Sequence, residues 1–178
     1  MWQIVANQVA TKEAILNPFT FYYQHADDWC LSHSYEFWSK GNTVAAITNQ
    51  KIVKTIFDPS ISGYILPSSA AFTGFTKYGT NTFQSSEYNV SGAFLNGWSF
   101  YTMGWKSGLT FHLYALGWRN TYNSDGSIIS YEYGGTYWTA IMASNTMTYQ
   151  LHIEPVRINP QDSYYRSNGR CCLSTLEY

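Results

Sequence analysis

The spacing of apolar and polar positions changes along the chain, and the clearest pattern lies after residue 90. There, short apolar and aromatic runs are separated by glycine and polar residues, which is typical of short antiparallel strands. The pattern predicts strands at 97–101, 109–116, 128–129, 137–140 and 149–153. In the last run, alternation places Tyr149, Leu151 and Ile153 on one face, and Gln150 and His152 on the other, outer face.

Before residue 90 the pattern is less regular and predicts two short helices. Thr11 is placed to cap a helix over 12–16, and Pro18 ends it because proline disfavours a helical residue before it. Ser68 and Ser69 are placed to cap a second helix that begins within 68–72.

Turn signals separate these elements. The densest one covers 58–67, where Asp58-Pro59 starts a turn, Gly63 gives a permissive backbone position and 64–66 forms a short strand. Asp125-Gly126 predicts a hairpin turn. We therefore expect one α+β domain over 1–178, with two short helices, short antiparallel sheets and long irregular loops. Residues 1–14 are a candidate linker to an upstream region.

The composition is poor in charge and rich in aromatic residues. Only 12 % of the 178 residues are charged, against about 25 % in an average soluble domain, and the chain has 16 Tyr and 7 Trp. One interpretation is a β-rich core with polar turns. The other is a recognition surface, since Tyr and Trp give large contact areas and Ser, Asn and Gly give adaptable hydrogen bonds. Composition alone leaves both open.

Charge and hydropathy exclude several classes of partner. The net charge is −1 and the Lys and Arg residues are scattered, so we expect no nucleic-acid binding. No window approaches 18 uninterrupted apolar residues, so we expect no membrane insertion. The first 16 residues lack the pattern of a signal peptide. The three cysteines allow one disulfide, between Cys30 and either Cys171 or Cys172, or three free thiols.

Several short phrases, in order along the chain, carry a resemblance to a known family. They are WC (29–30), KTIFDP (54–59), GYILP (63–67), FTGF (72–75), GWRN (117–120), DG (125–126), GTYWTA (135–140), YQLHI (149–153), NP (159–160) and RSNG (166–169). Through them the chain resembles the FISUMP-type major paralogous domain of gut bacteria and their phages. That family is similar to the formylglycine-enzyme branch of the C-type-lectin fold, so the resemblance implies a C-type-lectin-like scaffold.

The resemblance also implies a function. Members of the family sit on bacterial surface proteins, pilus tips and phage tail-fibre tips, and some resemble targets of diversity-generating retroelements, which rewrite codons in the last third of the domain. The implied location is extracellular, on a cell surface or a virion. The implied partner is a host-cell or bacterial surface protein or glycan. One departure is that the chain reads GRCC (169–172) where the family closes with Gly-x-x-Val-Arg.

Catalytic and metal-binding patterns are weak in this sequence. There is no Gly-x-Ser-x-Gly nucleophile elbow and no Cys-x-x-Cys or His-x-x-x-His pair. Glu154-Pro155-Val156 lacks the amide that follows Glu-Pro in calcium-dependent lectins, and Cys171-Cys172 lack the surroundings of the formylglycine-generating cysteines. We therefore expect no enzymatic activity, no cofactor and no metal.

The candidate ligand-binding residues are polar and aromatic positions of the last third, expected in loops or on strand faces that point away from the apolar side. They are Tyr131, Tyr133, Thr136, Ser144, Asn145, His152, Glu154, Arg157, Asp162, Tyr164 and Tyr165. Trp118, Arg119, Gly135 and Trp138 are interpreted as scaffold.

Two functional hypotheses follow. The first is an adhesin or phage tail-fibre tip domain with a variable aromatic and polar binding face, for which a homo-oligomer on a fibre or pilus would supply multivalency. The second is a structural decoration or assembly module of a surface appendage or virion, in which the aromatic residues pack against neighbouring subunits.

Overall fold

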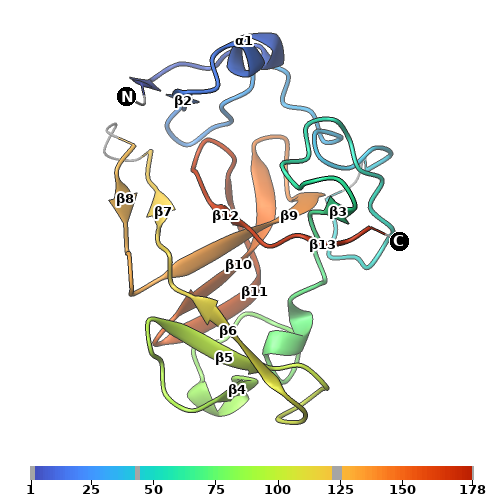
Figure 1. Ribbon diagram of the computed structural model, residues 1–178, viewed down its shortest axis with the longest axis vertical. Helices are drawn as coiled ribbons and strands as arrows, with labels where there is room; N and C mark the ends of the chain where they lie inside the picture. The colour runs from blue at the N-terminus through green and yellow to red at the C-terminus, as the bar shows by residue number, and fades with distance from the viewer. Residues whose placement is uncertain (1–2, 43–44, 122–125, 178) are drawn as a thin grey trace.

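The structure is a computed structural model that describes residues 3–42, 45–121 and 126–177 (Figure 1). Short strands dominate it, with one six-residue α-helix and two 3-10 turns. In chain order the elements are β1 (Gln3–Val5), α1 (Thr11–Leu16), β2 (Thr20–Tyr22), β3 (Tyr64–Ile65), η1 (Thr73–Phe75), η2 (Ser85–Glu87), β4 (Val90–Ser91), β5 (Gly97–Tyr101), β6 (Thr110–Tyr114), β7 (Trp118–Arg119), β8 (Ile128–Ile129), β9 (Gly135–Met142), β10 (Met147–Glu154), β11 (Arg157–Tyr165), β12 (Cys171–Cys172) and β13 (Thr175–Leu176).

The expected α+β class with two helices is wrong, because the molecule is mostly β, with 37 % of it in strands and 7 % helical. The second predicted helix is absent: residues 69–72 form turns that lead into η1. The side chain of Ser69 explains the difference. Its Oγ accepts a hydrogen bond from Thr48 N at 2.9 Å and donates one to Ala46 O at 2.7 Å. The hydroxyl expected to cap a helix therefore ties two loops together.

The first predicted helix, α1, forms as expected and ends at Leu16. The predicted cap does not form. The residue at the N-cap position is Ala10, and the Thr11 hydroxyl lies 3.3 Å from Cys30 Sγ. The C-terminal end of the helix is capped by Asn17, whose backbone N–H and side-chain amide both donate to Glu13 O.

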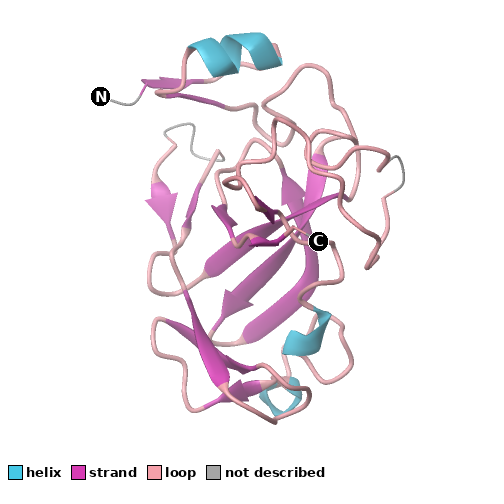
Figure 2. Ribbon diagram, turned by 45° about the vertical axis from the view of Figure 1, so that its right-hand side comes forward, coloured by secondary structure: helices cyan, strands magenta, loops and turns pink. Residues whose placement is uncertain are grey.

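A four-stranded sheet in the order β11-β10-β9-β12 forms the centre of the molecule (Figure 2). β10 pairs antiparallel with β9 and β11, and β12 pairs parallel with β9. The smaller sheets are β4-β5-β6, β7-β8, β13-β3 and the parallel pair β1-β2. These strands confirm the predicted runs after residue 90. The predicted Asp125-Gly126 turn falls partly outside the described residues, although β7 and β8 on either side of it pair antiparallel.

Two hydrophobic clusters cover the two faces of this sheet. Trp138 belongs to a cluster with residues of the first half of the chain, such as Trp38, whose ring lies 6.1 Å from it. Tyr137 belongs to the other cluster, with Leu151 and Ile153 of β10. Neighbouring residues of a strand point to opposite faces, so β9 contributes to both clusters and is buried along its whole length.

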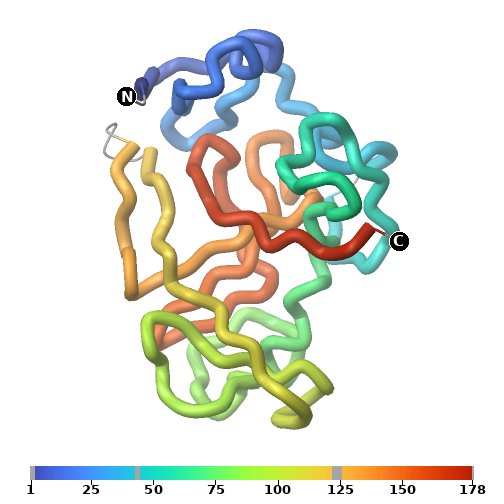
Figure 3. The backbone as a smooth tube through the Cα atoms, in the orientation of Figure 1, coloured from blue at the N-terminus to red at the C-terminus, as the bar shows by residue number. Residues whose placement is uncertain are grey.

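The N-terminal segment, residues 3–42, packs over one end of the sheet, while β12 and β13 cross the middle of the molecule (Figure 3). The loop 166–170 connects these parts. Ser167 N donates to Asp27 O, and the backbone groups of Gly169 exchange two hydrogen bonds with those of Arg119 in β7. No described segment forms a helix long and apolar enough to cross a membrane.

Candidate ligand-binding groove

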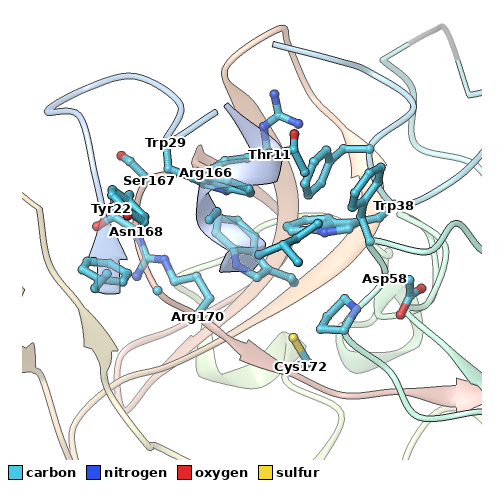
Figure 4. A pocket seen from close by; sticks show the side chains of 18 of the residues that line it. Thr11, Tyr22, Trp29, Trp38, Asp58, Arg166, Ser167, Asn168, Arg170 and Cys172 are labelled. Carbon is cyan, nitrogen blue, oxygen red and sulfur yellow. The ribbon is translucent and has the colours of Figure 1, made fainter. Parts of the chain in front are cut away.

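A groove of about 570 Å³ lies between the N-terminal segment and the loop 166–170 (Figure 4). α1, β2, the turn 56–59, β9 and β12 all contribute to its walls. Aromatic side chains dominate the lining, and among them are Tyr22, Trp29, Phe37, Trp38, Phe57 and Trp138. Ile56, which is 90 % exposed, lies at the mouth of the groove. Flat apolar walls of this kind suit a ligand with a ring face.

One wall of the groove is polar and comes from the loop 166–170. Ser167 and Asn168 are almost fully buried, yet Ser167 Oγ and Asn168 Oδ1 have no hydrogen-bond partner in the described chain. Asn168 Nδ2 donates to Thr121 Oγ1 at 3.2 Å, which fixes the orientation of the amide. A buried polar atom without a partner costs about 1–3 kcal/mol, so this wall is the kind of surface on which a ligand supplies missing bonds.

Arg166 begins this loop and is a structural connector. Its Nη2 pairs with Asp28 Oδ2 and donates to Asn145 O, and its Nη1 donates to Ser34 O at 2.8 Å. Both charged side chains of the pair are buried. Burial raises the pKa of Asp28 to about 6, even though Arg166 acts in the opposite direction. The pair therefore connects the N-terminal segment to the β9–β10 turn.

Arg170 ends the loop in a different setting. Its guanidinium lies over the rings of Tyr164 at 4.6 Å, Trp118 at 4.9 Å and Trp138 at 5.8 Å. Among the described residues its side chain makes a single hydrogen bond, from Nη1 to Thr136 Oγ1 at 3.4 Å, and its buried Nε has no partner there. Burial lowers the pKa of Arg170 to about 9, and within the described chain no carboxylate pairs with it.

Four of the predicted site residues form one charged network on the sheet face that Trp118 and Arg170 cover. His152 Nδ1 lies 3.2 Å from Asp162 Oδ2, and His152 Nε2 lies 2.9 Å from Glu154 Oε1. Arg157 Nη2 donates to the same Glu154 oxygen at 2.6 Å. Gln150 Nε2 donates to Asp162 Oδ2 at 2.8 Å. Burial acts to raise the pKa of Asp162, but the hydrogen bonds from His152 and Gln150 outweigh it and hold this pKa below its usual value.

The expectation of an outward-facing His152 is wrong. His152 and Glu154 are buried, at 7 % and 8 % exposure, because the network and the ring of Trp118, 5.4 Å from that of His152, cover them. Thr136 is also fully buried, in β9. These three side chains are packed against the sheet and do not form a loop surface. Gln150 Oε1 and Arg157 Nε are the unpartnered buried atoms of this network.

The other predicted residues fall into three places. Tyr164 and Tyr165 stack edge to face at 5.7 Å, and Tyr164 joins them to Arg170 and the groove. Ser144 and Asn145 lie in the β9–β10 turn, where Asn145 O accepts from Arg166. Tyr131 and Tyr133 are 63 % and 50 % exposed, in the connection between β8 and β9, and line no part of the groove.

The scaffold residues take positions consistent with that role. Trp138 is buried in the core. Gly135 packs so closely that an added Cβ would lie 2.8 Å from Tyr114 O. Arg119 Nη1 donates to Gly126 O at 2.8 Å. Trp118 and Trp138 have a second role, because both also stack on Arg170.

The cysteines and the potential metal ligands were also placed by the structure. Cys30, Cys171 and Cys172 are free thiols, so the disulfide alternative does not occur in this structure. Within residues 3–42, 45–121 and 126–177, no group of three His, Cys, Asp or Glu side chains is arranged to hold a metal ion. Cys172 also lines the groove.

None of the eleven candidate ligand-binding residues of the sequence analysis lines the groove. Trp29 and Trp38 lie in a segment without strand or helix periodicity, and they meet Trp138 only in the folded chain. Trp29 and RSNG (166–169), which belong to the phrases that carry the family resemblance, border the same groove. No protein-family model, curated protein or solved structure matches this chain.

Proposed function

We propose that this chain is a ligand-binding module of an adhesin or phage tail-fibre tip, and that its ligand occupies the groove. The observation that carries the proposal is the pairing of an aromatic lining with a wall of buried, unpartnered polar atoms at Ser167, Asn168 and Arg170. A groove of this size, mostly apolar with a few convergent polar groups, has the properties of ligand sites in general.

The construction of the groove supports the same function. Its walls are fixed by the Asp28–Arg166 ion pair and by the two hydrogen bonds between Gly169 and Arg119. A rigid frame of this kind reduces the conformational entropy that a ligand must overcome on binding. The resemblance to FISUMP-type domains points the same way, since that family displays binding residues on a rigid scaffold at cell and virion surfaces.

The predicted residues of the last third act partly through this groove. Tyr164 and Thr136 contact Arg170, so a change at either position alters the polar wall. We propose a surface protein or glycan of a host or bacterial cell as the ligand class. Several copies on one fibre or pilus would raise the avidity of weak single sites without any new contact.

Two variants at exposed aliphatic residues, one at the groove and one away from it, test whether the groove binds the ligand. Ile56→Glu places a charge at the groove mouth, while Leu109→Glu makes the same change at an 82 % exposed position outside it. Both residues are exposed, so both variants keep the fold. The proposal expects that fluorescent wild-type chain binds a panel of gut bacterial and host cells, that Ile56→Glu loses this binding at least tenfold, and that Leu109→Glu keeps it.

Three outcomes contradict the proposal. Equal loss in both variants, or no loss in Ile56→Glu, would place the ligand elsewhere. Absence of cell binding by an oligomerised wild-type chain, together with specific capture of a subunit of the appendage or virion, would favour the structural or assembly role.

A further inference from the structure

The charges of the groove are unevenly matched. Asp28 is paired with Arg166, and Asp58, on the side of the groove away from Arg170 in Figure 4, accepts hydrogen bonds from Ser60 N and Leu66 N. Arg170 is the one groove cation without a carboxylate partner among the described residues. The groups that act on its charge are Tyr164, Asp162 and Cys171, and none of them forms an ion pair with it.

The side chain of Arg170 is held in place while most of its donors stay free. A guanidinium has five N–H donors, and within the described part of the chain only the 3.4 Å bond to Thr136 Oγ1 uses one of them. The rings of Tyr164 and Trp118 confine the guanidinium, whose Cζ lies over both. A planar guanidinium fork matches the two oxygens of a carboxylate and binds it bidentately. The groove is therefore built for a ligand with an acidic group.

The tryptophan faces and the Ser167 and Asn168 side chains favour some acidic ligands over others. The apolar faces of Trp29 and Trp38 suit the C–H face of a pyranose ring, and Ser167 Oγ and Asn168 Oδ1 lack hydrogen-bond partners. Sugar hydroxyl groups both donate and accept, so they fit a hydroxyl and an amide oxygen side by side. An acidic peptide would satisfy Arg170, but its extended backbone brings far fewer hydroxyl groups to Ser167 and Asn168.

We propose that the groove binds an acidic sugar, a pyranose that carries a carboxylate, with the carboxylate on Arg170, the ring on the tryptophan faces and the hydroxyls on Ser167 and Asn168. This inference rests on the proposed function and names the chemical class of its ligand.

The test compares each acidic sugar with its own neutral form. Trigalacturonate, a hyaluronan tetrasaccharide and 3′-sialyllactose are titrated into the full chain by calorimetry, each beside its carboxyl methyl ester, and beside an acidic peptide of equal charge. We expect at least one acidic sugar to bind tenfold or more tightly than its ester. Arg170→Gln should reduce its affinity to that of the ester, and Arg170→Lys, which keeps the charge but loses the fork, should fall between them.

Lys106→Gln is the control, because Lys106 is a cation that also lies over an aromatic ring, that of Trp105 at 5.3 Å, but does not line the groove. It should leave the sugar affinity unchanged. Rising salt concentration should lower the affinity for the acidic sugar and leave the affinity for its ester unchanged. This comparison tests the charge contact in the wild-type chain even if the Arg170 variants fail to fold.

Equal affinity for acid and ester overturns the inference, and so does tighter binding of the peptide than of every sugar. Equal losses in Arg170→Gln and Lys106→Gln overturn it too. If no sugar binds while cell binding still depends on Ile56, the acidic-sugar inference fails and the groove remains the ligand site. If cell binding does not depend on Ile56, the proposed function itself fails.

Discussion

Two arginines at the two ends of one short loop have opposite surroundings. Arg166 pairs with Asp28 and donates to two backbone carbonyl groups. Arg170 lies among three aromatic rings, and its side chain makes one long hydrogen bond and no ion pair with any residue that the structure describes. Both are polar residues of the last third, and both line the groove.

The difference separates structural charge from charge that a ligand can use. A buried cation that pairs with a buried anion and donates to carbonyl groups of other segments, as Arg166 does, holds those segments together, and its removal damages the fold. A cation held by ring faces keeps its donors, so its removal should damage binding more than folding.

Arg166→Met should destabilise the protein by about 3–5 kcal/mol at pH 8, because it leaves the buried Asp28 carboxylate without its partner. The free energy of unfolding in urea measures this loss. At pH 5 the loss should be smaller, since Asp28 is largely protonated there. The double variant Asp28→Asn, Arg166→Met should recover much of the stability at pH 8. If the single variant is as stable as the wild type, the ion pair is not the connector described above.

Asp28 should also make the stability fall as the pH rises. Burial raises its pKa from 3.8 to about 6, so its proton is held more tightly in the folded chain than in the unfolded one. The contribution is complete below pH 4 and is lost as the pH rises through 6, and about two pKa units correspond to about 3 kcal/mol. The measurement is the difference in unfolding free energy between the wild type and Asp28→Asn from pH 4 to 8. A difference that does not change with pH would contradict it.

Arg170→Met should change the unfolding free energy by no more than about 1 kcal/mol, because the lost ring contacts, worth about 0.5–2 kcal/mol, are offset by removal of a buried charge. Urea unfolding beside Arg166→Met makes the comparison direct. A loss as large as that of Arg166→Met would show that the two arginines have the same structural role.

Tyr131→Ser and Tyr133→Ser should have the smallest effects, within about 0.5 kcal/mol in stability, because both side chains are at least half exposed. Cell binding should also stay unchanged, since neither residue lines the groove. If Tyr131→Ser abolished binding, the ligand site would move to the smaller hollow that Tyr131 shares with Leu95 and Leu116.

Local patterns predicted the local structure well. The apolar runs that became β5, β9 and β10 are visible from their spacing, and so is the helix over 11–16, because each depends on near neighbours. The prediction of a second helix was wrong because Ser69 forms hydrogen bonds with Thr48 and Ala46, which lie more than 20 residues before it in the sequence. A sequence pattern carries no information about such partners.

The groove itself was not predicted, for the same reason. Its polar wall lies in the last third but consists of Ser167, Asn168 and Arg170, none of which is a candidate residue, and its aromatic wall comes from Trp29 and Trp38. Asp28 and Arg166 are 138 positions apart, and only the folded chain brings them together. Alternation placed His152 away from the apolar core but did not reveal that Asp162, Glu154 and Trp118 would bury it.

The most direct measurement observes the two arginines in one experiment. In a ¹⁵N-labelled sample, the Nε–H signals of Arg166 and Arg170, assigned with the two single variants, are followed while the tightest-binding acidic sugar is added. A ligand carboxylate that contacts Arg170 should shift its signal in proportion to occupancy and leave that of Arg166 nearly unchanged. Equal shifts of both signals, or a shift of Arg166 alone, would contradict the division between structural and ligand-binding charge.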